Sequence, residues 1–105
     1  MSLRDAYVQK LKARITELNA DIDRLAPMID KADAETRIRY YKQLENLRER
    51  RKGVEESIAE LQQAGESVWE DLKQGLENSW EILKTSLSKA KSEFERGYRE
   101  GRDED

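Results

Sequence analysis

Residues 8–32, VQKLKARITELNADIDRLAPMIDKA, carry an apolar residue at alternating steps of three and four positions. Beta-branched residues begin each seven-residue unit, and leucine or alanine stands at its fourth position. The series is Val8, Leu11, Ile15, Leu18, Ile22, Leu25, Ile29 and Ala32. Such a heptad predicts a helix whose apolar seam packs against another helix. Ser2, three residues before Asp5, resembles a capping box, so we expect this helix to span about residues 3–31.

Pro27 is the one residue of this stretch that opposes a regular helix. A proline inside a helix removes a backbone hydrogen bond and clashes with the carbonyl four residues earlier, at a cost of about 3 kcal/mol. Pro27 stands at the heptad position farthest from the seam, where a bend would leave the apolar contacts in place. We therefore predict a bent helix rather than a break at residue 27.

A second apolar series predicts another helix over about residues 35–64. Its members are Leu44, Leu47, Val54, Ile58 and Leu61, with Arg51 in line with them. The intervening residues 31–36 are small or polar. Asp33 suits a helix N-cap, but alanine and glutamate also favour an uninterrupted helix. The two series therefore form either a coiled-coil hairpin or one extended rod.

Charge pairing favours the hairpin over the rod. If the chain folds back near residues 34–35, Ile22 faces Leu47, and the flanking residues acquire partners of opposite sign. In that register Lys12 meets Glu55, and Asp21 meets Arg50. Flanking charges of this kind set the partner and the orientation of coiled-coil helices.

An 11-residue repeat marks a third helix, over about residues 67–96. Residues 69–79, WEDLKQGLENS, and 80–90, WEILKTSLSKA, match at Trp, Glu, Leu, Lys and Leu. Eleven residues make three turns at about 3.67 residues each, so one face recurs without drift. The repeat predicts an amphipathic stripe that needs cover, formed by Val68, Trp69, Leu72, Leu76, Trp80, Leu83, Leu87 and Phe94.

Both ends of this third helix carry boundary signals. Gly65 is typical of a residue just past a helix end, and Ser67 with Glu70 forms a capping box. The apolar phase nevertheless continues from Leu61 to Val68, so we predict a local bend that keeps the helical direction. Residues 97–105 form an acidic tail that we expect to fray.

Composition supports a single all-α domain over residues 1–105. Charged residues make up 41% of the chain and there is one proline, which favours long helices. The chain lacks cysteine and histidine, and this excludes thiolate chemistry and the commonest acid–base side chain. No apolar stretch reaches about 18 residues, and the first ten residues lack a secretory signal's apolar core. We expect a cytoplasmic protein without cofactors or metals.

The stripe has two competing interpretations, helix packing and lipid-surface binding. Tryptophan at the margin of an apolar face suits a lipid headgroup interface. Residues 65–105, however, contain seven basic and eleven acidic residues, so anionic lipid would repel them. Small residues also repeat beside the stripe, at Gly75, Ser86 and Gly97, and these favour contact between helices. Lys73 and Lys84, each four residues after a tryptophan, are more readily explained as solvated lysines than as cation–π partners.

One feature suggests phosphate contacts, a cluster of basic residues formed by Arg48, Arg50, Arg51 and Lys52, with Arg37, Arg39 and Lys42 upstream. Residues 36–64 contain seven basic and five acidic residues, so their net charge is only +2. Because Glu45 and Glu49 lie among the arginines, a solvated, salt-bridged helix face is the better interpretation. Nucleic acid is therefore an unlikely partner.

Two stretches, DAYVQKLKARITE at 5–17 and VWEDLKQGLENSW at 68–80, resemble the two ends of a group of small uncharacterised bacterial coiled-coil proteins. The resemblance covers most of residues 4–95 and implies a long-helical fold without an established activity. Pro27 is atypical of that group. We expect a non-enzymatic, structural, self-associating coiled-coil protein, whose partner is a second copy or another helical protein. The alternative is a lipid-surface or stress-protectant amphipathic helix protein.

Overall fold

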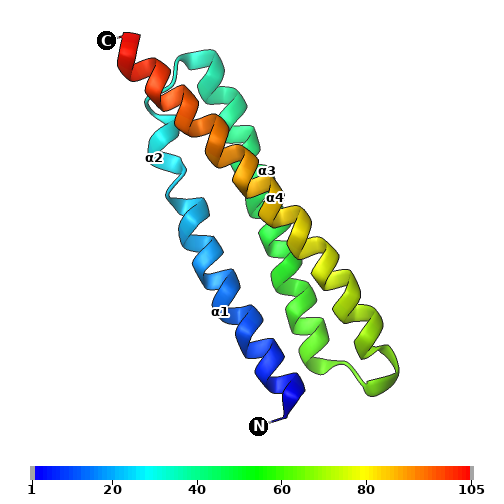
Figure 1. Ribbon diagram of the computed structural model, residues 1–105. Helices are drawn as coiled ribbons and strands as arrows, with labels where there is room; N and C mark the ends of the chain where they lie inside the picture. The colour runs from blue at the N-terminus through cyan, green and yellow to red at the C-terminus, as the bar shows by residue number, and fades with distance from the viewer. Residues whose placement is uncertain (1, 105) are drawn as a thin grey trace.

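The structure, a computed structural model, describes the backbone of residues 2–104 and the side chains of residues 2–97. Four helices follow one another in the chain: α1 (Leu3–Asp23), the single turn α2 (Ala26–Ile29), α3 (Ala34–Gln63) and α4 (Glu66–Glu104). The described residues contain no strand, which confirms the predicted all-α class. Figure 1 shows the three long helices side by side with alternating directions.

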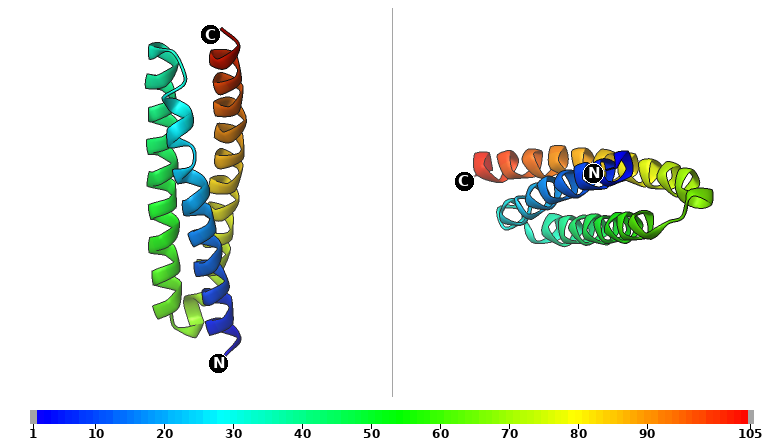
Figure 2. Two further views of the ribbon diagram at one scale, coloured as in Figure 1. Left: turned by 90° about the vertical axis from the view of Figure 1, so that its left-hand side faces the viewer. Right: turned by 90° about the horizontal axis from the view of Figure 1, so that it is seen from below.

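The molecule is elongated, and the hairpin is the arrangement that it adopts. Its Cα atoms extend over 57 × 21 × 15 Å with a radius of gyration of 16.8 Å, against about 13 Å for a compact domain of this length. α1 packs antiparallel to α3, and α4 returns along α3. In Figure 2, α1 lies between α3 and α4 in the side view. The three helices therefore enclose one core within one chain.

The first helix is interrupted before Pro27, so the predicted continuous helix over residues 3–31 is wrong. α1 ends at Asp23, and a turn at Arg24 and Leu25 separates it from α2. Pro27 has no N–H to donate to the carbonyl of Asp23, the residue four positions earlier. The backbone before it instead forms a tighter turn, in which Leu25 N donates to the carbonyl three positions earlier, Ile22 O, at 3.1 Å. The seam survives, because Leu25 and Ile29 are both buried.

The N-cap predicted at Ser2 is confirmed, and of the two alternatives for residues 31–36 the chain adopts the one in which Asp33 caps a new helix. The Ser2 hydroxyl accepts a hydrogen bond from Asp5 N at 3.1 Å, and the Asp33 carboxylate accepts one from Thr36 N at 2.9 Å. The bond from Thr36 lowers the pKa of Asp33 below its usual value. Tyr41 closes the same turn by donating to Asp30 Oδ1 at 3.1 Å. These bonds explain why the chain turns at residues 30–33 rather than continuing as a rod.

The boundary near Gly65 reverses the chain, so the predicted bend that keeps the helical direction is wrong. α3 and α4 are antiparallel neighbours joined by two residues, of which Ala64 is extended at φ −72° and ψ 143°. Gly65 has no positive φ. α4 begins at Glu66, which places Ser67 inside the helix rather than at its predicted cap. An extended backbone at residue 64 thus makes the turn.

Twelve residues of the two predicted heptad series lie in the interior of the chain. They are Val8, Leu11, Ile15, Leu18, Ile22, Leu25, Ile29, Leu44, Leu47, Val54, Ile58 and Leu61. Arg51, in line with them, is only half-buried and pairs with Glu55 on its own helix at 3.6 Å. The predicted charge pairs are wrong: Glu55 accepts from Asn19 at 3.4 Å, and Asp21 pairs with Arg24 at 3.1 Å.

α4 continues well beyond the end predicted near residue 96. Its backbone is helical through Glu104, and Asp105 lies outside the described residues. Gly97 is buried against α3 rather than marking a helix end. Arginine and glutamate, which dominate the last residues, are good helix formers.

Candidate functional site

The 11-residue repeat packs against the rest of the chain with a phase slightly different from the predicted one. Trp69, Leu76, Leu83, Leu87 and Phe94 are buried, and Leu72 and Trp80 are half-buried. Val68, in contrast, keeps 46% of its surface exposed. The buried face therefore passes through Trp69, which was expected at its margin. Because the helix is covered on two sides, by α1 and by α3, its apolar face is wider than a narrow stripe.

A cluster of aromatic and charged side chains joins the start of α1 to the start of α4. The Tyr7 and Trp69 rings meet edge to face at 5.7 Å between centroids. The Arg4 guanidinium lies 5.0 Å from the Trp69 ring, and Lys73 Nζ lies 4.9 Å from the Tyr7 ring and 5.5 Å from Trp69. Lys73 thus makes the cation–π contact that the sequence alone disfavoured. These contacts confirm that Trp69 packs against another helix.

Tyr7 also makes the polar contact of this cluster. Its hydroxyl donates to Glu77 Oε1 at 2.9 Å. Burial, and then the bond to the Glu77 carboxylate, raises the pKa of Tyr7 to about 12. Both effects favour the neutral phenol. The ring therefore acts as a neutral hydrogen-bond donor that holds α1 against α4.

A second aromatic contact joins α3 to the C-terminal half of α4. Tyr40 stacks on Phe94 at 4.2 Å, and its hydroxyl donates to the Glu93 carbonyl at 2.7 Å. Gly97 makes room for this ring, whereas a Cβ on Gly75 would meet open space. Of the small residues that repeat beside the stripe, Gly97 therefore permits a close approach by α3, whereas no helix of this chain approaches Gly75.

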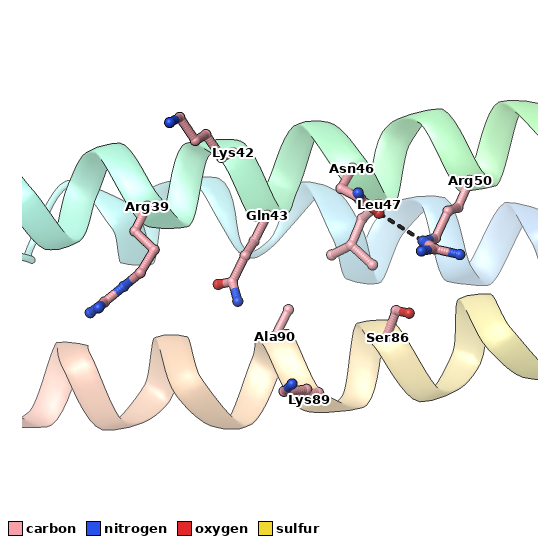
Figure 3. A pocket seen from close by; sticks show the side chains of 9 residues that line it. All are labelled: Arg39, Lys42, Gln43, Asn46, Leu47, Arg50, Ser86, Lys89 and Ala90. Atoms are coloured by element: carbon pink, nitrogen blue, oxygen red, sulfur yellow. Dashed lines mark hydrogen bonds between the residues drawn. The ribbon is translucent and has the colours of Figure 1, made fainter.

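A cleft lies between α3 and α4, with a volume of about 380 Å³. We call it the α3–α4 cleft; its lining residues are Arg39, Lys42, Gln43, Asn46, Leu47, Arg50, Ser86, Lys89 and Ala90. Figure 3 shows Arg39 and Gln43 pointing from α3 toward α4, with α1 and α2 behind them, whereas the end of Lys42 points away from α4. Leu47 and Ala90 are buried and form an apolar floor.

The rim of the α3–α4 cleft is cationic. Arg39, Lys42, Arg50 and Lys89 line it together, and no acidic residue does. Among the described residues, none of the four forms a salt bridge. Arg50 Nε instead donates to Asn46 Oδ1 at 2.7 Å.

The predicted salt-bridged helix face therefore divides into two parts. Arg48 pairs with Asp23 of α1 at 3.9 Å, and Arg51 pairs with Glu55, as expected of a salt-bridged surface. Arg39, Lys42 and Arg50 line the cleft, whereas Glu45 and Glu49 do not. Arg37 instead donates to the Ala32 carbonyl at 3.4 Å. The net charge of residues 36–64 does not reveal this separation, because it sums residues on all sides of the helix. The spacing of Arg39, Gln43, Asn46 and Arg50, in steps of four, three and four, is the signal that would have revealed it.

Metal binding and membrane crossing find no support in the described residues. No group of three or more acidic side chains there is arranged to hold a metal ion. No helix of that part of the chain combines the length and the apolar character needed to cross a membrane. Comparison with known proteins gave no matching family model, no similar curated protein and no similar solved structure.

Proposed function

We propose that this protein acts without catalysis, as a helical bundle that associates with a second copy of itself through the outer face of α4. The chain has no cysteine or histidine. The pKa values of Tyr7 and Tyr41 are raised and that of Asp33 is lowered, so each of these shifts leads away from neutral pH. A catalytic acid or base works best with a pKa near the working pH. A binding role fits this chemistry better.

The observation that carries self-association is a row of apolar and small residues left on the surface of α4. We call Val68, Gly75, Ser79 and Ile82 the outer row. Val68 and Ile82 expose 46% and 51% of their surface, and the space beside Gly75 is open. Val68, Gly75 and Ile82 repeat every seven residues, as along a coiled-coil seam. A second helix could approach closely at Gly75.

The charges of α4 favour an antiparallel arrangement of the two copies. Residues 66–82 carry five acidic residues and one basic residue, whereas residues 84–97 carry four basic and two acidic residues. Their net charges are therefore −4 and +2. Antiparallel pairing centred on Ile82 places the acidic half of one α4, with Val68 and Gly75, beside the basic half of the other. Ile82 then meets its copy, whereas parallel pairing places like charges together. Complementary charge fixes the orientation of partners more than it adds affinity.

Light scattering after size exclusion tests this proposal. We expect a concentration-dependent approach to twice the 12.3 kDa mass of the chain, and a weaker dimer at high salt because the charges are screened. Ile82→Glu should return the protein to the monomer mass with an unchanged helical spectrum. Ile38→Glu is the matched control, because Ile38 is 61% exposed on α3. A monomer mass at all concentrations, or equal effects of the two variants, would contradict the proposal.

Lipid-surface binding remains the second possibility, and the burial of Trp69 opposes it. The apolar face of α4 is enclosed by α1 and α3, so the bundle must open before that face can meet a membrane. We expect tryptophan emission to be blue-shifted in buffer and to change little when phosphatidylcholine or phosphatidylglycerol vesicles are added. Water-like emission that moves to the blue only with vesicles would favour the lipid function instead.

A further inference from the structure

We propose that the α3–α4 cleft binds a small amphiphilic anion, with its phosphate or carboxylate group near Arg39, Arg50 and Lys89 and its apolar part on the floor. This proposal is separate from self-association and rests on different observations. Those observations are the cationic rim, the apolar floor and, in the cleft wall, a buried amide oxygen without a hydrogen-bond partner.

The rim contains a higher local density of positive charge than the chain as a whole would suggest. The chain has a net charge of −3, yet four cations and no carboxylate line this cleft. Like charges held together repel one another, and an anion between them relieves that repulsion. Two of the four are arginines, whose planar forks match the oxygens of carboxylate and phosphate groups.

The floor determines which anions suit the site. Leu47 and Ala90 are 2% and 3% exposed and lie between the basic side chains. Ser86 adds a small side chain at one end, so a flat ring or short chain fits between the helices. A volume of about 380 Å³ lies at the lower end of the range for small-molecule sites, about 300–1,000 Å³. An inorganic ion would leave most of that space to water.

Gln43 adds a polar group with an unused acceptor to the wall. Its amide nitrogen donates to Glu93 Oε2 at 2.7 Å, which fixes the orientation of the side chain. Its Oε1 is buried and has no hydrogen-bond partner. Buried acceptors are normally satisfied. A hydroxyl or N–H group on the ligand, or a water that it holds, would satisfy this one. Glu93 itself lines the adjoining hollow with Arg39 and Arg96, not the α3–α4 cleft.

Three probes separate the anionic from the apolar contribution: phenyl phosphate, inorganic phosphate and phenol. Chemical shifts of the backbone amides report both affinity and location. We expect phenyl phosphate to bind more tightly than inorganic phosphate, and phenol to show no saturable binding. The shifts should be confined to residues that line the cleft. Equal affinity for phenyl phosphate and inorganic phosphate, or shifts spread over the surface, would overturn the proposal.

Matched variants test the role of the rim. Arg50→Gln combined with Lys89→Gln should weaken phenyl phosphate binding by about tenfold, since two exposed charge contacts are removed. Arg50→Lys in place of Arg50→Gln should recover part of the loss, because it keeps the charge. Lys10→Gln combined with Lys12→Gln removes the same charge from exposed positions on α1 and should leave binding unchanged. Equal weakening by both pairs would show only a general attraction to positive charge, and would overturn the site.

The phenyl phosphate titration is repeated with the Ile82→Glu variant, which should not self-associate. Lys89 borders the cleft and also belongs to the basic half of α4, so a second copy could compete with the anion there. Binding that persists in the Ile82→Glu variant supports the cleft whether or not the chain self-associates. Loss of binding in that variant would contradict an anion site within one chain.

Discussion

The Tyr40 hydroxyl oxygen lies 2.5 Å from the point where a Cβ atom on Gly97 would stand. The Tyr40 ring, stacked on Phe94, reaches the α4 backbone only because residue 97 has no side chain. Gly97 thus serves packing between helices, although glycine inside a helix costs about 0.5–1 kcal/mol relative to alanine. Gly75, on the same helix, has no neighbour in this position.

Gly97→Ala should destabilise the protein by about 1–3 kcal/mol, because the added methyl group displaces the Tyr40 ring. Gly53→Ala, on α3 where an added Cβ would meet open space, is the matched control and should stabilise the protein by about 0.5–1 kcal/mol through helix propensity alone. Urea unfolding measures both changes. Tyr40→Phe should reduce the cost of Gly97→Ala in a double-mutant cycle. Stabilisation by both alanines would show that Tyr40 does not occupy this position.

Because the pKa of Tyr7 is raised in the folded chain, the free energy of unfolding should fall as the pH becomes alkaline. Tyr7 stays neutral in the folded chain up to a pKa of about 12, whereas an unfolded tyrosine ionises at about 10. The contribution of Tyr7 to stability is therefore complete below about pH 10 and is lost as the pH rises through its folded pKa. Tyr7→Phe should remove this part of the alkaline loss.

Tyrosinate absorbance and urea unfolding, followed from neutral to alkaline pH, check the Tyr7 prediction. Glu77→Gln should return the pKa of Tyr7 toward its ordinary value, because a hydrogen bond to a carboxylate favours the neutral phenol. Tyr41→Phe controls for a second tyrosine whose pKa is raised, here by its bond to Asp30. Identical alkaline transitions in the original chain and in Tyr7→Phe would refute this account of the cluster.

Substitution by aspartate should cost much more stability at Ile22, in the heptad interior, than at Ile38 on the surface. Ile22 is completely buried and Ile38 is 61% exposed. Ile22→Asp should cost more than about 4 kcal/mol, because it places an unpaired charge in an apolar core. Ile38→Asp should change stability by less than about 1 kcal/mol. Thermal melting followed by circular dichroism compares the two, and similar melting temperatures would show that the packing register is wrong.

The sequence predicted the parts of the fold that depend on periodicity and capping. The heptad residues from Val8 to Leu61 are buried because burial of one helix face dominates packing. Asp33 caps α3 because residues of its type favour that position. Periodicity gave a wrong prediction at Gly65. The regular spacing of apolar residues continues from Leu61 to Val68, although the chain reverses its direction between them. One-dimensional phase carries no information about direction once the backbone leaves the helix.

The cleft and the true face of α4 needed three-dimensional information. The 11-residue period predicts a single narrow stripe with Trp69 at its margin, whereas α4 contacts both α1 and α3 and buries a wider face that includes Trp69. Lys89 lies 39 positions after Arg50, so only the antiparallel return of α4 brings them to one cleft. Pro27 was placed on the correct side of its helix, but its missing N–H interrupts the ladder instead of bending it.

The most direct test of the fold is the distance between spin labels at residues 12 and 55, in α1 and α3. The chain has no cysteine, so Lys12→Cys and Glu55→Cys provide specific attachment sites. Pulsed electron paramagnetic resonance on labelled chains diluted with unlabelled chains reports distances within one molecule. A chain that closes its core on itself predicts about 20 Å, which combines one helix spacing, an offset along the helices because Glu55 faces Asn19, and the reach of the labels. A distribution near 65 Å, the length of about 43 residues of continuous helix, without a short population would contradict the three-helix bundle.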